Sequence, residues 1–122
     1  MASSIFNITV DCADTRAMAD FWAAALGWQL EDPVDDEDMI AVEPPLGSLP
    51  SLLFIRVPEG KVGKNRIHLD LNPPDQDLEV GRLIAMGASP VDIGQGEQTW
   101  VVLADPEGNE FCVLTPRGPE AT

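Results

Sequence analysis

The chain has 122 residues, 44% of them hydrophobic, and its 21 acidic against 7 basic residues give a formal net charge of −14. One domain with a sizeable core is expected at this length. Such acidity argues against nucleic acid or an anionic membrane as partner, because both need clustered cations. Two cysteines are too few for a disulfide framework, and no signal peptide or long apolar run is evident. A soluble protein of the reduced cytoplasm is therefore expected.

The first half opens with a predicted strand and a predicted helix. Alternation of apolar and polar residues predicts the strand at about Ile5 to Asp11, with Asn7 and Thr9 on its polar side. Asp14 is a good N-cap for the helix that follows, and Gly27 suits the left-handed residue after its last turn. Apolar residues at helical spacing predict the buried stripe of this helix: Met18, Phe21, Trp22 and Ala25.

Three further strands are predicted in the first half, at Trp28–Pro33, Met39–Glu43 and Leu52–Val57. The acidic run at 35–38 predicts a solvated turn, because it lacks the glycine and the spaced ligands of a calcium loop. Alternation in the last of these strands places three side chains on one face, and we expect that face to line a cleft. They are Leu52, Phe54 and Arg56.

The second half opens with the most regular alternation in the chain, at Arg66–Leu71. Its apolar residues predict a strand with one face in the core, and its other face carries Arg66, the only histidine, His68, and Asp70. A helix begins near Asp75 or Asp77. The residues expected to be buried in this helix include Leu78, Leu83 and Met86.

Short strands are then predicted at Pro90–Ile93, Thr99–Ala104 and Glu110–Thr115. The segment 105–108, Asp-Pro-Glu-Gly, has Asp, Pro and Gly at the first, second and fourth positions, where a type I turn favours them. Alternation places Glu110 and Cys112 on one face of the last strand.

The two halves repeat each other. Asn7 precedes Gly27 by 20 residues and His68 precedes Gly87 by 19, so the halves superpose with an offset of 60 or 61. The sequence therefore predicts one α+β domain of two β-α-β-β-β modules, about 1–60 and 61–122, each with a helix covering one face of its sheet. The other faces are expected to curve around a shared cleft, where His68 is the counterpart of Asn7.

Three segments extend this organisation to a known family: 21–28 with Phe-Trp and Leu-Gly-Trp, the strand 66–71, and 105–111, Asp-Pro-Glu-Gly-Asn-Glu-Phe. Together with the repeated module, they resemble the vicinal oxygen chelate superfamily, and more narrowly its glyoxalase-like and bleomycin-resistance group. The resemblance implies that superfamily's fold, a curved mixed sheet around a cleft. Its members include isomerases, dioxygenases, thiol transferases and non-enzymatic drug sequesterers, so the fold does not select an activity.

The resemblance also implies where a divalent metal would be held. The family's ligand positions fall on Asn7, near Phe54, on His68 and on Cys112. Of these only His68 keeps a strong ligand type for such an ion, whereas catalytic metal sites normally use about three protein ligands. No metal and no other cofactor is therefore expected.

Polar groups among apolar ones are typical of a small-molecule pocket. The candidate ligand-binding residues are Asn7, Thr9, Phe54, Arg56, Arg66, His68, Trp100, Glu110 and Cys112. Arg56 and Arg66 could equally form structural ion pairs with Asp70 or Glu110, and Trp100 could equally pack in the core.

Two functions remain open. The first is metal-free binding or sequestration of a small drug-like molecule or metabolite by a homodimer. The second is a lyase or isomerase with His68 as general base beside Asp70, since histidine titrates near neutral pH. In a less favoured form of the second, His68 binds a divalent metal.

Overall fold

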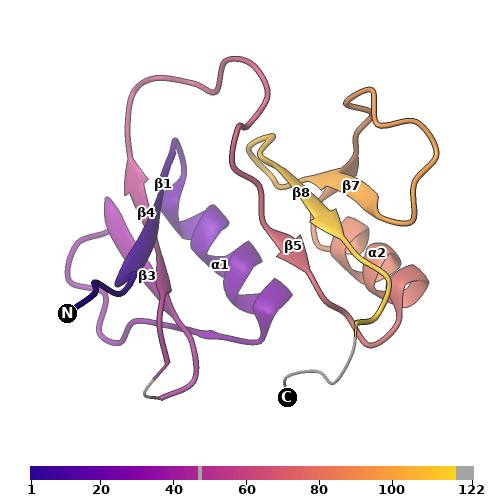
Figure 1. Ribbon diagram of the computed structural model, residues 1–122. Coiled ribbons are helices and arrows are strands. Elements are labelled where there is room, and N and C mark those ends of the chain that lie inside the picture. Colours follow the sequence, from indigo (N-terminus) through magenta and orange to yellow (C-terminus); the bar gives the residue numbers. More distant parts are fainter. Residues whose placement is uncertain (47, 118–122) are drawn as a thin grey trace. The chain divides into compact units, whose positions relative to one another are not determined.

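The computed structural model describes residues 1–46 and 48–117. The chain divides into two compact units, unit 1 (Met1–Gly60) and unit 2 (Lys61–Thr122) (Figure 1). Each unit holds four strands and one helix in the order β-α-β-β-β, so the predicted α+β class and the duplicated module are confirmed. Each unit forms its own four-stranded mixed sheet. None of the helices in the described part of the chain has the length and apolar character needed to cross a bilayer.

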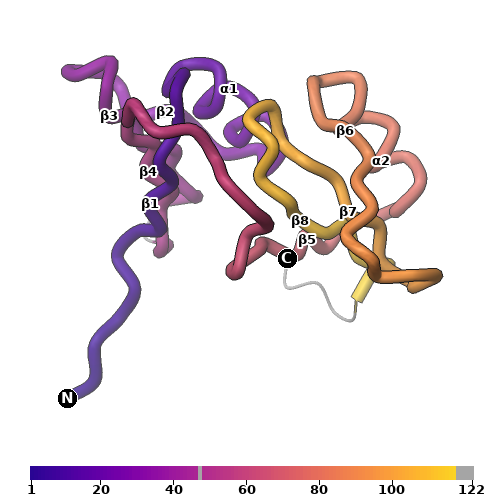
Figure 2. Tube along the Cα trace, turned by 90° about the horizontal axis from the view of Figure 1, so that it is seen from above, coloured from indigo at the N-terminus to yellow at the C-terminus, as the bar shows by residue number. Residues whose placement is uncertain are grey.

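The sheet of unit 1 has two central strands between two edge strands. Its elements are β1 (Asn7–Cys12), α1 (Thr15–Leu26), β2 (Gln29–Leu30), β3 (Met39–Glu43) and β4 (Ser51–Arg56). The sheet order is β1-β4-β3-β2, with β1 parallel to β4 and the other pairs antiparallel. Residues 1–6 leave β1 as an extended tail (Figure 2).

Helix α1 forms where its signals predicted it. The Asp14 carboxylate accepts a hydrogen bond from the Ala17 N–H at 3.0 Å, and Gly27 ends the helix with a φ of 69°. The predicted stripe is buried and packs against β3 and β4. This stripe, with the sheet residues Ile40, Val42, Leu52 and Phe54, forms the core of unit 1.

The predicted face of β4 was wrong. Phe54 has no exposed surface and is the register partner of Val10 and Ile40, so it lies in the core of unit 1 rather than on an open face. The register instead places Leu53 beside Thr9. The sequence could not set this phase, because residues 52–55 are all apolar and either face would have satisfied the alternation.

Unit 2 repeats the arrangement with shorter strands. Its elements are β5 (Asp70–Leu71), α2 (Gln76–Ala85), β6 (Ser89–Pro90), β7 (Val101–Ala104) and β8 (Glu110–Val113), in the sheet order β5-β8-β7-β6. Strand β5 runs parallel to β8, and the remaining pairs are antiparallel. Asp75 caps α2 by accepting from the Leu78 N–H at 3.0 Å. The most buried residues include Leu83, Leu103, Phe111 and Val113.

The structure corrects the predicted length of the first strand of unit 2 and the predicted burial of Leu78. Only Asp70 and Leu71 of the predicted strand 66–71 pair with β8, and Ile67 is 82% exposed. Leu78 is 75% exposed rather than buried. Leu78 and the buried Leu83 are five positions apart, which is about 140° around a helix, so the two cannot share one narrow face.

The turn between β7 and β8 is built around a buried carboxylate. Asp105 is 3% exposed, and its carboxylate accepts from the Glu107 and Asn109 N–H groups at 3.0 Å each. The Gly108 N–H donates to the Asp105 carbonyl at 2.9 Å, which closes the predicted four-residue turn. Gly108 takes a φ of 89°, a conformation that favours glycine. The turn therefore fixes where β8, with Glu110 and Cys112, begins.

Candidate functional site

Three side chains of unit 2 meet on one side of its sheet. Asp70 and Cys112 are register partners in the β5–β8 pair, so their side chains share a face. His68 lies two residues before Asp70, in irregular backbone. Its Nδ1 is 3.0 Å from Asp70 Oδ1 and 3.8 Å from Cys112 Sγ. The face predicted from alternation in unit 2 is therefore occupied by these three groups, although only Asp70 and Cys112 lie in strands.

The two polar members of this cluster are accessible and the thiol is not. The His68 and Asp70 side chains are 39% and 49% exposed, whereas Cys112 is 5% exposed. A carboxylate accepts hydrogen bonds only, so the hydrogen bond to Asp70 assigns the proton of a neutral imidazole to Nδ1. Nε2 then carries the lone pair, and it can accept a proton or a hydrogen bond from a ligand.

Cys112 contributes a neutral thiol at neutral pH. Burial raises the pKa of this thiol, and the neighbouring Asp70 carboxylate raises the pKa further. The thiolate is the nucleophilic form of cysteine, so an elevated pKa argues against Cys112 as an attacking group.

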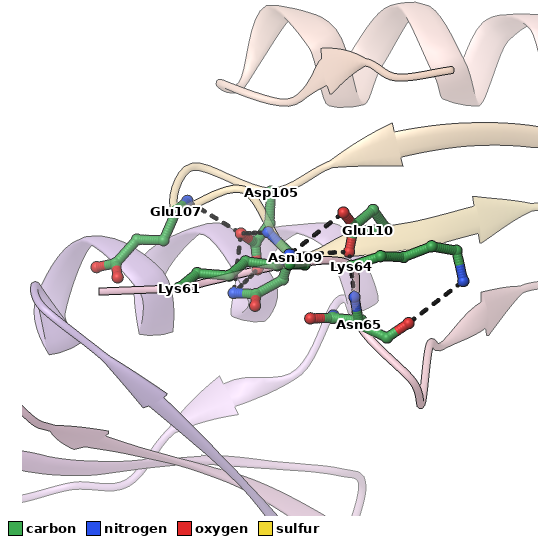
Figure 3. Close-up of polar contacts among 8 residues, drawn as sticks. Lys61, Lys64, Asn65, Asp105, Glu107, Asn109 and Glu110 are labelled. Atoms are coloured by element: carbon green, nitrogen blue, oxygen red, sulfur yellow. Dashed lines mark hydrogen bonds and ion pairs between the residues drawn. The ribbon is translucent and has the colours of Figure 1, made fainter. Parts of the chain in front are cut away.

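Glu110, another predicted ligand-binding residue, is engaged within unit 2. Its carboxylate accepts from the Asn65 N–H at 2.8 Å and lies 3.3 Å from Lys61 Nζ (Figure 3). Burial alone would raise the pKa of Glu110, but the hydrogen bonds from Asn65 and Lys61 outweigh it, and the pKa lies below its ordinary value. Lys61 and Asn65 were missed at the sequence level, because the segment that holds them has no periodic pattern.

The remaining predicted residues have contacts of their own within each unit. Asn7 and Thr9 belong to β1 of unit 1 and contact each other, with Thr9 Oγ1 donating to Asn7 Oδ1 at 3.4 Å. Arg56, also in unit 1, pairs with Asp38 at 4.0 Å rather than with Asp70 or Glu110. Arg66 is exposed, and the half-buried Trp100 lines a shallow hollow with residues 90–91 and 95–102. A single pocket shared by all of these residues stays a prediction.

The fold family implies a divalent ion, and the residues present do not fit its site. The fourth-strand position falls near Phe54, which is a core residue, and the position of the last-strand carboxylate holds the Cys112 thiol. Within the described residues, the ligand atoms of His68, Asp70 and Cys112 do lie within 4.8 Å of one another. This donor set has one nitrogen, one oxygen and one buried sulfur. It suits a thiophilic ion better than an ion that prefers an octahedral, oxygen-rich site.

Comparisons with known proteins agree with this architecture. A protein family described as "Glyoxalase-like domain" matches residues 7–114. None of the curated proteins matches the sequence. Similar solved structures include a glyoxalase/bleomycin resistance protein/dioxygenase family enzyme from Burkholderia phytofirmans PsJN, with 18% identity, a TM-score of 0.73, and coverage of 94% of this chain and 100% of that one.

Two further structures show how varied these relatives are. A glyoxalase-related enzyme from Fulvimarina pelagi has 17% identity and a TM-score of 0.68, covering 99% of this chain and 96% of that one. TnmS3, an antibiotic binding protein from Streptomyces sp. CB03234, has 23% identity and a TM-score of 0.61, covering 95% and 98% respectively. At such identities the likeness shows the fold alone.

Proposed function

Because this chain belongs to the glyoxalase-like domain family of the vicinal oxygen chelate superfamily, we propose that it binds a small drug-like molecule or metabolite without a metal ion. The carrying observation is the His68–Asp70 contact of 3.0 Å, which presents Nε2 of a partly exposed imidazole on the sheet face of unit 2. A few oriented polar groups beside buried apolar ones are typical of small-molecule sites. The antibiotic-binding relative supports this proposal by analogy.

The binding role predicts a ligand that offers a hydrogen-bond donor to His68 Nε2. A thermal-shift screen of antibiotics and small aromatic metabolites, followed by calorimetric titration of the hits, tests it. We expect saturable one-site binding that His68→Ala weakens and that Asp77→Ala, an exposed change on α2, leaves unaltered. A screen whose hits bind His68→Ala as tightly as the unmodified protein would contradict the proposal.

A second function follows from the same contact. A histidine whose Nδ1 is held by a carboxylate is oriented as a general base, so a lyase or isomerase activity with His68 as base and Asp70 as its orienting partner is the alternative. Recovery of the bound compound separates the two functions. Sequestration returns it unchanged, whereas an enzyme returns a converted product whose formation requires the His68 imidazole.

The proposed setting is the reduced cytoplasm, with the chain working as a homodimer. Cys12 and Cys112 are buried thiols that form no disulfide in the described part of the chain, and this supports the reducing compartment. Two arguments support dimerisation. Members of the superfamily commonly pair modules within or between chains, and edge strands of open sheets expose unpaired backbone groups that a second chain can cover.

A further inference from the structure

The segment that carries His68 has little strand pairing of its own. Residues 61–69 are irregular, and regular pairing begins only at Asp70. On the C-terminal side of His68, the Leu69 carbonyl accepts from the Cys112 N–H at 2.9 Å. On the N-terminal side, the Asn65 N–H donates to Glu110 Oε1 at 2.8 Å. The segment around His68 is therefore hydrogen-bonded to the same strand, β8, on both sides of the histidine.

The Glu110 attachment is strengthened by Lys61. Lys61 Nζ lies 3.3 Å from both carboxylate oxygens and also donates to the Gly63 carbonyl. The pair is partly buried, with the Lys61 and Glu110 side chains 22% and 13% exposed. The Glu110 carboxylate thus contacts both the Lys61 side chain and the Asn65 backbone N–H (Figure 3).

The positions of Glu110 and Cys112 on β8 connect the Glu110–Asn65 hydrogen bond to His68. Glu110 and Cys112 are two residues apart, so they share a face of the sheet about 7 Å apart. Cys112 lies against the His68 imidazole and Glu110 binds the backbone three residues before it. Both contacts are therefore made from β8, whose first residue follows directly on the hydrogen-bonded Asp105 turn.

From this geometry we infer that Glu110 is a positioning residue for His68: through Asn65 and Lys61 it fixes the segment that aims the imidazole at Asp70. The inference rests on the proposed function for its biological meaning, but not for its test. It predicts that loss of the Glu110 carboxylate releases His68 from Asp70 even when no ligand is present.

The single histidine makes this directly measurable. In ¹⁵N-labelled protein without ligand, the imidazole nitrogen shifts report the His68 tautomer alone, since the chain has one histidine. We expect the Nδ1–H form to dominate in the unmodified protein. In Glu110→Ala the ratio of Nδ1–H to Nε2–H should fall about fivefold, the size of one lost hydrogen bond. Glu110→Gln, which keeps an acceptor for Asn65, should restore most of the ratio.

Glu79→Ala is the matched control, because Glu79 pairs with Arg82 on α2 at 2.8 Å and has no contact with this segment. If Glu110→Ala does not fold, Asn65→Pro removes the same N–H while leaving the Lys61–Glu110 pair in place. A folded Glu110→Ala or Asn65→Pro protein with the unmodified tautomer ratio would overturn the inference, as would an equal change in Glu79→Ala. Failure to find any ligand would refute the proposed function without touching this result.

Discussion

His68 and Asp70 are joined by a 3.0 Å contact between Nδ1 and Oδ1, although only Asp70 is held in a strand. The carboxylate is fixed by sheet pairing with Cys112, and the imidazole is placed by the loop before it. Such a pair orients a ring without burying it, so its replacement should affect ligands far more than folding.

His68→Ala should therefore weaken ligand binding about tenfold, or 1.4 kcal/mol, while changing the free energy of unfolding by less than ~0.5 kcal/mol. The reason is that both side chains are accessible, so water can replace the lost contact. Calorimetric titration and urea unfolding of the same variant check this. A large loss of stability with unchanged affinity would assign His68 a structural role.

The purified protein should carry far less than one equivalent of divalent metal per chain. Of the four positions that the family uses as metal ligands, only His68 keeps a strong ligand type, and the others are Asn7, a core phenylalanine and a buried thiol with a raised pKa. Elemental analysis after dialysis measures this content. The contrary result is one equivalent of zinc that is lost in Cys112→Ser and retained in Cys12→Ser, the matched change at the buried thiol of unit 1.

Glu110 should make stability depend on pH in the acidic range. Its pKa is lowered on folding, so the folded state favours the carboxylate and the stabilisation is complete above the ordinary value of 4.5. It is lost as the pH falls from 4.5 through the folded pKa. Denaturant unfolding from pH 7 downward should show a smaller acid loss in Glu110→Gln, and parallel curves for the two proteins would contradict the ion pair's role.

Phe54→Ala should lower the free energy of unfolding by about 3–5 kcal/mol, because it leaves a cavity in the core of unit 1. Thr9→Ala, an exposed change on the other face of the same sheet, should cost less than ~0.5 kcal/mol. Thermal melts of both variants compare the two faces directly. A stable Phe54→Ala protein with impaired ligand binding would return Phe54 to the ligand site.

The protein should run as a homodimer of about 26 kDa, twice the 13.2 kDa chain. Multi-angle light scattering across micromolar concentrations measures the mass. A constant mass near 13 kDa would show that the chain is complete as a monomer.

Sequence patterns predicted the elements well where one face is apolar and the other polar. The Asp14 cap, Gly27 and the 105–108 turn follow from local chemistry and formed as expected. Of the two predicted starts of the second helix, Asp75 and Asp77, the structure selects Asp75 as the cap. The pattern failed at β4, where both faces are apolar, and at 66–69, where regular pairing with β8 begins only at Asp70 although β8 itself starts at Glu110.

The residues of the candidate site could likewise be predicted only in part. His68, Asp70 and Cys112 could be placed on one face from their spacing, because two of them are register partners in neighbouring strands. Lys61 and Asn65 could not, since their contacts with Glu110 join positions 45 or more residues apart in irregular backbone. Only a three-dimensional arrangement shows which loop atoms satisfy a half-buried carboxylate.

The division into two units also separates the chain's chromophores. Trp22 and Trp28 belong to unit 1 and Trp100 to unit 2, and tyrosine is absent from the sequence. Replacing Trp22 and Trp28 by phenylalanine would therefore leave an emission spectrum that reports unit 2 alone. If its unfolding midpoint departs from that of the circular dichroism signal, the two halves unfold as separate cooperative blocks; coincident midpoints would make the duplicated chain one cooperative block.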